Sequence, residues 1–168
     1  MKEVFIVSAK RTPIGGFMGM LANYSATELG AIAIMEAYKS VGVEATAINS
    51  VYMGNVLSAN LGQAPARQAS MFAYIPSVID CTTINKVCSS GLKATSIGAQ
   101  QIQLGLENLV LTGGMESMSN APHYVNLRKT VKLGHEQFSD VLLKDGLTDV
   151  YNNFHMGVAA EMCVKEYN

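Results

Sequence analysis

The sequence predicts an α/β fold in which a mostly parallel sheet is built from βαβ units. Short apolar or β-branched segments alternate with longer segments of helical pattern from residue 4 to residue 112. The first short segment, residues 4–7, is apolar without alternation, as in strands that helices cover on both faces. In such sheets, ligands bind beyond the carboxyl ends of the strands.

The composition is that of an ordinary globular chain and argues against several classes of function. The 168 residues are 49% hydrophobic and 15% charged, with a net charge of −1. There is no basic surplus for nucleic acid, and no run of about 18 apolar residues that could span a membrane. The N-terminus is a poor signal peptide because Glu3 precedes a very short apolar run. We therefore expect neither a nucleic-acid nor a membrane partner.

The cysteines favour a reducing compartment. Cys81, Cys88 and Cys163 are odd in number, and no two of them have the CxxC spacing. This pattern argues against a disulfide framework and against a zinc site, so we expect no metal and a cytoplasmic location.

The segment after the first expected strand carries a clear helix start. Ser25 and Glu28 match a capping box, which predicts a helix from there to near Gly42. The second strand is expected at residues 50–54. Pro65 suits the first turn of the next helix, which is expected to start at residue 63 or 64.

The third strand and its helix meet at Cys88. Residues 81–87 are rich in β-branched side chains, which predicts a strand. Ser89 and Ser90 then offer capping hydroxyls, and Gly105 suits the end of the helix. A thiol at a helix start faces unpaired N–H groups and the positive end of the helix dipole, and both favour the thiolate. Free cysteine is also among the most buried residue types, so position alone leaves nucleophile and core residue open.

The pattern changes in the last third of the chain. A fourth strand is expected at residues 108–112, but the alternation of strands and helices stops after Ser119. This change predicts an α/β domain at residues 1–118 and a second domain that begins at 119 and includes a helix still running at residue 168. The second domain carries a basic cluster, Arg128, Lys129 and Lys132.

Five segments in the same order resemble the N-terminal portion of thiolases, specifically the acetoacetyl-CoA branch. The segments are VSAKRTPIGGFMG, MGNVLSANLGQAPARQA, TINKVCSSGLKA, LTGGMESMSNAPH and KDGLTDVYNNFHMGVAAE. The resemblance covers all 168 residues, which correspond to less than half of a whole thiolase. It implies a thiolase-like N-terminal domain that lacks its last strand, followed by part of a loop domain that serves oligomerisation and covers the substrate.

The resemblance also implies a chemistry. Cys88 matches the nucleophile that takes an acetyl group from acetyl-CoA as a thioester, and its backbone N–H would be a donor to the oxyanion. A second acetyl-CoA would then give acetoacetyl-CoA and CoA, with no cofactor beyond the CoA of the substrates. His155 and Met156 match residues near the pantetheine arm and the acyl group. Without that context, His155 is typical of a helix start and Met156 of core packing.

Parts of the family's machinery have no match in this chain. Thiolases carry an activating histidine and a second, acid–base cysteine in a C-terminal domain, and neither Cys81 nor Cys163 stands in the matching context. We therefore expect the 168 residues alone to be inactive, and the whole protein to be a homodimer or homotetramer. The basic cluster by itself is typical of a solvated loop, and the resemblance favours a place at a subunit interface over one at the CoA phosphates. A long-chain 3-ketoacyl-CoA thiolase and a catalytically silent binding or assembly module are the alternatives.

Overall fold

The structure is a computed structural model that describes residues 1–128 and 133–167. The chain divides into two compact units, Met1–Asn120 and Ala121–Asn168. The division into an α/β domain at residues 1–118 and part of a loop domain from residue 119 stays a prediction.

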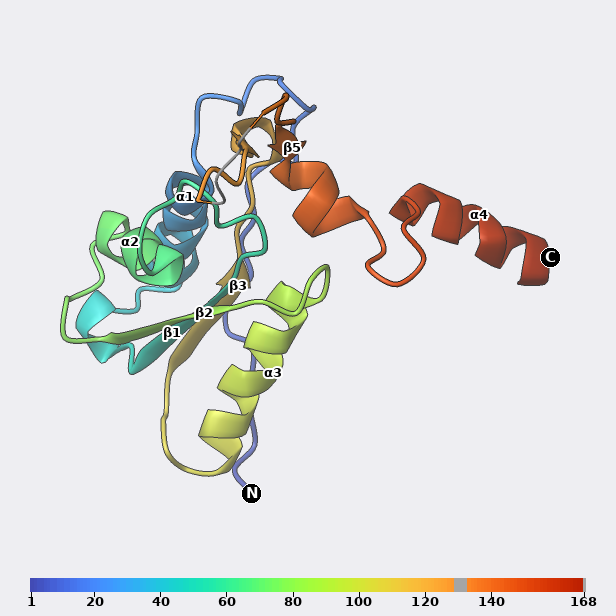
Figure 1. Cartoon of the computed structure of the whole chain (residues 1–168). Helices are drawn as coiled ribbons and strands as arrows, with labels where there is room; N and C mark the ends of the chain where they lie inside the picture. The colour runs from blue at the N-terminus through green and yellow to red at the C-terminus, as the bar shows by residue number, and fades with distance from the viewer. Residues whose placement is uncertain (129–132, 168) are drawn as a thin grey trace. The chain divides into compact units, whose positions relative to one another are not determined.

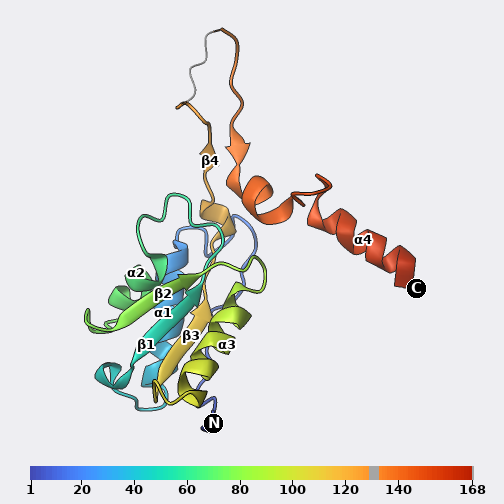
Figure 2. The same ribbon diagram turned by 60° about the horizontal axis from the view of Figure 1, so that its bottom comes forward.

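The first unit alternates helices with parallel strands. Its elements are α1 (Ala26–Lys39), η1 (Ala45–Ala47), β1 (Ser50–Gly54), α2 (Pro65–Phe72), β2 (Asp80–Ile84), α3 (Ser90–Gln103), β3 (Val110–Gly114) and η2 (Met118–Asn120). The strand order is β2-β1-β3, and β1 pairs in parallel with both neighbours. Helices α1 and α2 pack together on one face of the sheet, and α3 covers the other (Figure 1, Figure 2). The predicted α/β class with a parallel sheet is therefore confirmed.

The core lies around the central strand, which helices cover on both faces. Val51 and Met53 of β1 are 0% and 2% exposed, and Ile34 of α1 is 1% exposed. Burial of the central strand on both faces explains why its sequence shows little polar alternation. Pairing on both sides also places the end of β1 between the ends of β2 and β3.

Several local predictions are confirmed by hydrogen bonds. The Glu28 amide donates to Ser25 Oγ at 3.3 Å, and the Ser25 amide donates to Glu28 Oε2 at 2.8 Å, which completes the capping box of α1. Pro65 opens α2. Gly105 follows α3 with a φ of +76°, a conformation that glycine adopts at little cost.

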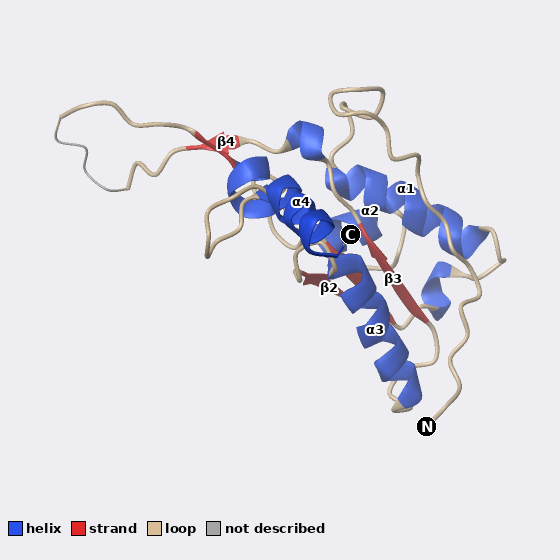
Figure 3. Cartoon of the chain, turned by 90° about the vertical axis from the view of Figure 1, so that its right-hand side faces the viewer, coloured by secondary structure: helices blue, strands red, loops and turns tan. Residues whose placement is uncertain are grey.

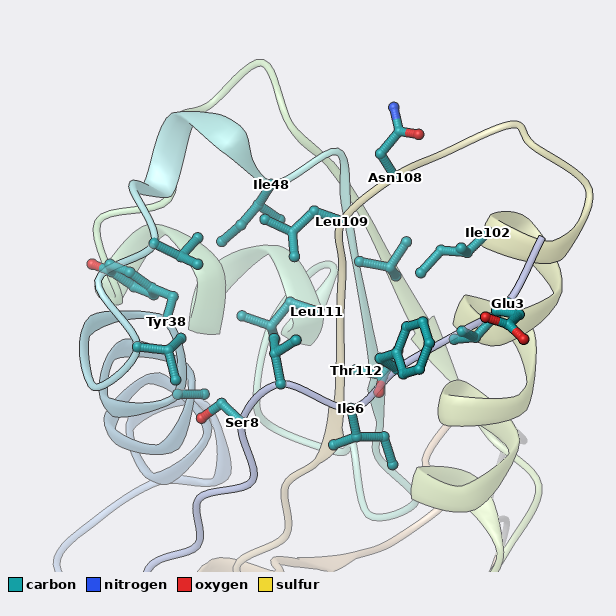
Figure 4. A pocket seen from close by; sticks show the side chains of 17 residues that line it. Glu3, Ile6, Ser8, Tyr38, Ile48, Ile102, Asn108, Leu109, Leu111 and Thr112 are labelled. Carbon is teal, nitrogen blue, oxygen red and sulfur yellow. The ribbon is translucent and has the colours of Figure 1, made fainter.

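The prediction of a first strand at residues 4–7 is wrong. This segment is loop, and it runs beside β3 without a ladder of hydrogen bonds (Figure 3). A groove of about 300 Å³ separates residues 3–8 from residues 108–112, with Tyr38, Ile48 and Ile102 also on its walls (Figure 4). Because this gap keeps the two backbones apart, Phe5, Ile6 and Val7 stay between 62% and 81% exposed. The apolar sequence of residues 4–7 could not show that no strand is hydrogen-bonded to this segment.

The second unit is built from short elements and one longer helix. It contains the antiparallel pair β4 (His123–Tyr124) and β5 (Ser139–Asp140), the π-helix η3 (Leu142–Leu147) and α4 (Met156–Tyr167). Lys129 and Lys132 of the expected basic cluster, and the expected continuation of the last helix to residue 168, lie outside the described residues. Within residues 1–128 and 133–167, no helix has the length and apolar character needed to cross a membrane.

Candidate active site

The carboxyl ends of the three parallel strands meet at one edge of the sheet. Gly54 at the end of β1 is in register with Ile84 of β2 and with Gly114 of β3. The segments that leave these ends carry Asn55, Cys88 and Glu116. This edge is where ligands bind in open parallel sheets.

The turn that carries Cys88 starts earlier than predicted. The strand expected to reach Val87 ends at Ile84, because Lys86 donates its amide to Ser90 Oγ at 2.9 Å instead of joining the ladder. The expectation that Ser89 caps α3 with its side chain is also wrong. Its hydroxyl donates to the Lys86 carbonyl at 2.9 Å, and thereby closes the turn.

Val87 holds a strained backbone directly before the thiol. Its φ is +49°, in the left-handed region that a β-branched residue adopts only under constraint. The Val87 amide donates to Asn85 Oδ1 at 3.0 Å, which fixes the start of the turn. Such a conformation costs about 1–3 kcal/mol and is concentrated at functional sites. The turn between β2 and α3 therefore holds a strained residue next to Cys88, which the sequence did not indicate.

Cys88 is exposed at the tip of this turn, two residues before α3. The two other free cysteines differ in setting, since Cys81 in β2 is half-buried and Cys163 is exposed on α4. Core packing therefore does not account for Cys88 in this structure. Its role as nucleophile, and the role of its backbone N–H as an oxyanion donor, stay predictions.

The end of β1 packs directly under the start of α3. A Cβ added at Gly54 would lie 2.5 Å from the Gly91 nitrogen and 2.6 Å from the Ser90 carbonyl carbon. Both are backbone atoms, so neither can rotate away. The close approach of Gly54 thus sets the position of the helix that follows the Cys88 turn.

A half-buried carboxylate lies at the same edge, and the sequence reasoning missed it. Glu116, after β3, accepts from Asn55 Nδ2 at 2.8 Å and from the amides of Val56 and Leu57 at 2.9 and 3.0 Å. Burial raises the pKa of Glu116, while the two backbone hydrogen bonds oppose the rise. The available signal was that Asn55 and Glu116 each follow a strand end at the ligand edge of a parallel sheet.

Glu116 should make the stability of the first unit fall as the pH rises. Its folded pKa is raised above the ordinary value of 4.5, so its contribution is fully present below that value and is lost as pH rises through the folded pKa. We expect the free energy of unfolding of the wild type to fall, relative to Glu116→Gln, as the pH rises above 4.5. Urea unfolding across this range measures the difference, and parallel curves for the two proteins would contradict it.

His155 and Met156 lie where the last helix begins. His155 is exposed and directly precedes α4, and Met156 is half-buried as its first residue. The Gly157 amide donates to His155 Nδ1 at 2.9 Å, so the proton of the neutral ring lies on Nε2. The helix-start setting of His155 is therefore what the structure shows. Because both residues belong to the second unit, their placement toward Cys88 stays a prediction.

The described residues offer no obvious metal centre. Within residues 1–128 and 133–167, no three His, Cys, Asp or Glu side chains gather as ligands for an ion.

Comparisons with known proteins agree on one family. The family model described as "Thiolase, N-terminal domain" matches residues 4–168. Acetyl-CoA acetyltransferase 2 of Arabidopsis thaliana is 53% identical over 167 residues, which are 99% of this chain and 41% of that protein. The cytosolic acetyl-CoA acetyltransferase ERG10 of Gibberella zeae is 49% identical and covers 100% of this chain and 43% of its own length. The mitochondrial acetyl-CoA acetyltransferase of Homo sapiens is also 49% identical, with 100% and 39% covered.

A solved structure matches as well. The Acat5 thiolase from Ascaris suum in complex with coenzyme A superimposes with a TM-score of 0.95 at 48% identity, over 99% of this chain and 43% of that one. The chain thus spans about two fifths of the length of the curated relatives it matches.

Proposed function

Because this chain belongs to the thiolase family, we propose that the whole protein condenses two acetyl-CoA molecules to acetoacetyl-CoA and CoA, or runs the reverse thiolysis. The matching relatives are named acetyl-CoA acetyltransferases, and the solved thiolase holds coenzyme A. The observation that carries the proposal is the exposed thiol of Cys88 on a strained turn at the ligand edge of a parallel sheet.

The chemistry proceeds in two steps. The sulfur of Cys88 attacks the carbonyl carbon of acetyl-CoA, CoA leaves as its thiol, and the acetyl group stays on Cys88 as a thioester. A second acetyl-CoA loses a proton from its methyl carbon and attacks this thioester, which releases acetoacetyl-CoA and the free thiol of Cys88. Both steps form an oxyanion, for which the backbone N–H of Cys88 is the donor proposed in this chain.

The second unit supplies the substrate contacts in this proposal. His155 offers its Nε2–H to a polar group of the pantetheine arm, because its Nδ1 already accepts from the Gly157 amide. Met156 packs against the acyl group and restricts the site to short chains. The reaction needs no metal or organic cofactor, because an acyl group moves between thiols and a carbanion and the CoA is part of the substrate.

The cellular setting is also part of the proposal. We place the protein in the cytosol as a homodimer or homotetramer. Three free cysteines suit a reducing compartment, and the relatives include a form named cytosolic beside mitochondrial ones. The oligomer rests on the family resemblance alone.

A haloacetyl analogue of acetyl-CoA tests the function in a full-length protein that carries this chain. We expect the analogue to alkylate Cys88 faster than Cys163, and free CoA to slow the reaction at Cys88 only. Peptide mass spectrometry measures both rates, with Cys88→Ser and Cys163→Ser as matched controls. Equal rates at the two exposed thiols, with no protection by CoA, would point to a silent binding or assembly module. Equal capture of a long-chain analogue would favour the long-chain thiolase.

A further inference from the structure

We propose that Glu116 and Asn55 are positioning residues for Cys88, which hold the strained turn in place from outside the turn. The inference rests on the proposed function, because it assigns the pair a part in presenting the thiol for reaction. Neither side chain is placed in contact with the reacting atoms.

Glu116 fixes the loop after β1. Its carboxylate collects three donors from three consecutive residues: the side chain of Asn55 at 2.8 Å and the amides of Val56 and Leu57 at 2.9 and 3.0 Å. Asn55 Nδ2 also donates to the Met115 carbonyl at 3.2 Å. These three hydrogen bonds tie the loop after β1 to the segment that follows β3.

The same loop is tied to both sides of the Cys88 turn. The Asn55 amide donates at 3.0 Å to the carbonyl of Ile84, the last residue of β2 before the turn. Gly54, the preceding residue, packs against the backbone of Ser90 and Gly91 where the turn ends. A shift of this loop therefore moves the entry and the exit of the turn together.

The Cys88 turn needs a restraint from outside. Val87 keeps a φ of +49° although its side chain is β-branched. The hydrogen bonds from Lys86 to Ser90 and from Ser89 to Lys86 join residues of the turn only to each other. Strained backbone persists where the surrounding structure over-determines it, and the Glu116–Asn55 pair provides that surrounding structure.

The burial of Asn55 supports a dedicated role. The residue is 1% exposed, and its Oδ1 is a buried acceptor with no hydrogen-bond partner among the described residues. An unpaired buried acceptor is costly, so packing alone does not favour an amide at this position. The two bonds from Nδ2, to Glu116 and Met115, orient the side chain and offset part of that cost.

The opposite edge of the sheet provides a matched control. Glu107 accepts from Ser50 Oγ at 2.6 Å, and Ser50 is 1% exposed at the start of β1. This pair is also a carboxylate that holds a buried polar side chain of β1, but it lies at the end of the strand away from Cys88. Glu107→Gln therefore removes a comparable carboxylate without touching the turn.

The experiment measures alkylation of the three cysteines by iodoacetamide in the 168-residue chain. Cys163 gives the rate of an ordinary exposed thiol, and the half-buried Cys81 reports any general opening of the sheet. We expect Glu116→Gln to lower the ratio of the Cys88 rate to the Cys163 rate by about fivefold, while Cys81 is unchanged. Glu107→Gln should leave the ratio as it is.

A further readout separates positioning from simple loss of stability. In a Val87→Gly background the strain is absent, so the effect of Glu116→Gln should shrink to about twofold or less. A deficit equal in both backgrounds would overturn the proposal.

Hydrogen exchange of the wild type tests the proposal without a substitution. If Glu116→Gln opens the sheet, so that Cys81 reacts faster, hydrogen exchange of the wild type becomes the deciding measurement. The amides of Val56 and Leu57 should open together with those of Ser89 and Ser90, as one unit. Independent opening of the two pairs would refute the coupling. Iodoacetamide needs no CoA site, so this test is independent of the proposed function. If these expectations are met but CoA gives no protection at Cys88, the proposed function is wrong and the positioning role of Glu116 and Asn55 stands.

Discussion

Replacement of Gly54 by alanine is expected to destabilise the first unit by about 3 kcal/mol or more, at the upper end of what overpacking costs. The new Cβ would lie 2.5 Å from the Gly91 nitrogen and 2.6 Å from the Ser90 carbonyl carbon. Both atoms belong to the backbone at the start of α3, so relief requires movement of the helix or of the central strand. Either movement also displaces the turn that carries Cys88.

Gly16→Ala is the matched control for this substitution. A Cβ at Gly16 would meet no atom within 4 Å, and Gly16 does not have a positive φ, so alanine can adopt its backbone conformation. Urea unfolding followed by circular dichroism should therefore place Gly16→Ala near the wild type and Gly54→Ala far below it. Similar midpoints for the two variants would show that the start of α3 yields freely and that Gly54 does not position the turn.

The elements that the sequence predicted well are those with a local cause. The capping box of Ser25 and Glu28 and the proline at the start of α2 depend on neighbouring residues only, and the structure confirms them. The bounds of β1, Ser50–Gly54, also agree with the prediction.

The failures have a tertiary cause. Residues 4–7 have the sequence of a strand, but a strand needs a hydrogen-bonded neighbour, and the groove beside β3 separates them from one. The third strand ends at Ile84 because the side chain of Ser90 captures the Lys86 amide across the turn. Local sequence does not reveal a hydrogen bond that forms only after the chain has turned back on itself.

The candidate site was predicted in part, for the same reason. The setting of Cys88 between a strand and a helix follows from sequence order, whereas its exposure and the positive φ of Val87 belong to the folded turn. Glu116 escaped notice because a single carboxylate has no motif. Its importance comes from three donors on a segment about 60 residues earlier in the chain.

The 168 residues alone should show negligible turnover of acetoacetyl-CoA, and a chimera that supplies the rest of a thiolase should restore it. The resemblance assigns the histidine that activates the nucleophile and the second cysteine to the part of the family that this chain does not match. General acid–base groups contribute about 10²–10⁴-fold each, so two of them predict a gain of at least about 10⁴-fold. This gain exceeds the effect expected from any of the single substitutions in the chain.

Acetyl-CoA acetyltransferase 2 of Arabidopsis thaliana is a suitable donor, because this chain is 53% identical to it and covers 41% of its length. The chimera joins these 168 residues to the remaining part of that protein, and CoA-dependent loss of acetoacetyl-CoA absorbance measures the activity. Cys88→Ser in the chimera is the control, since it removes the proposed nucleophile, which this chain supplies. Activity that survives Cys88→Ser, or an isolated chain within about tenfold of the chimera, would be incompatible with a thioester on Cys88 that depends on a separate acid and base.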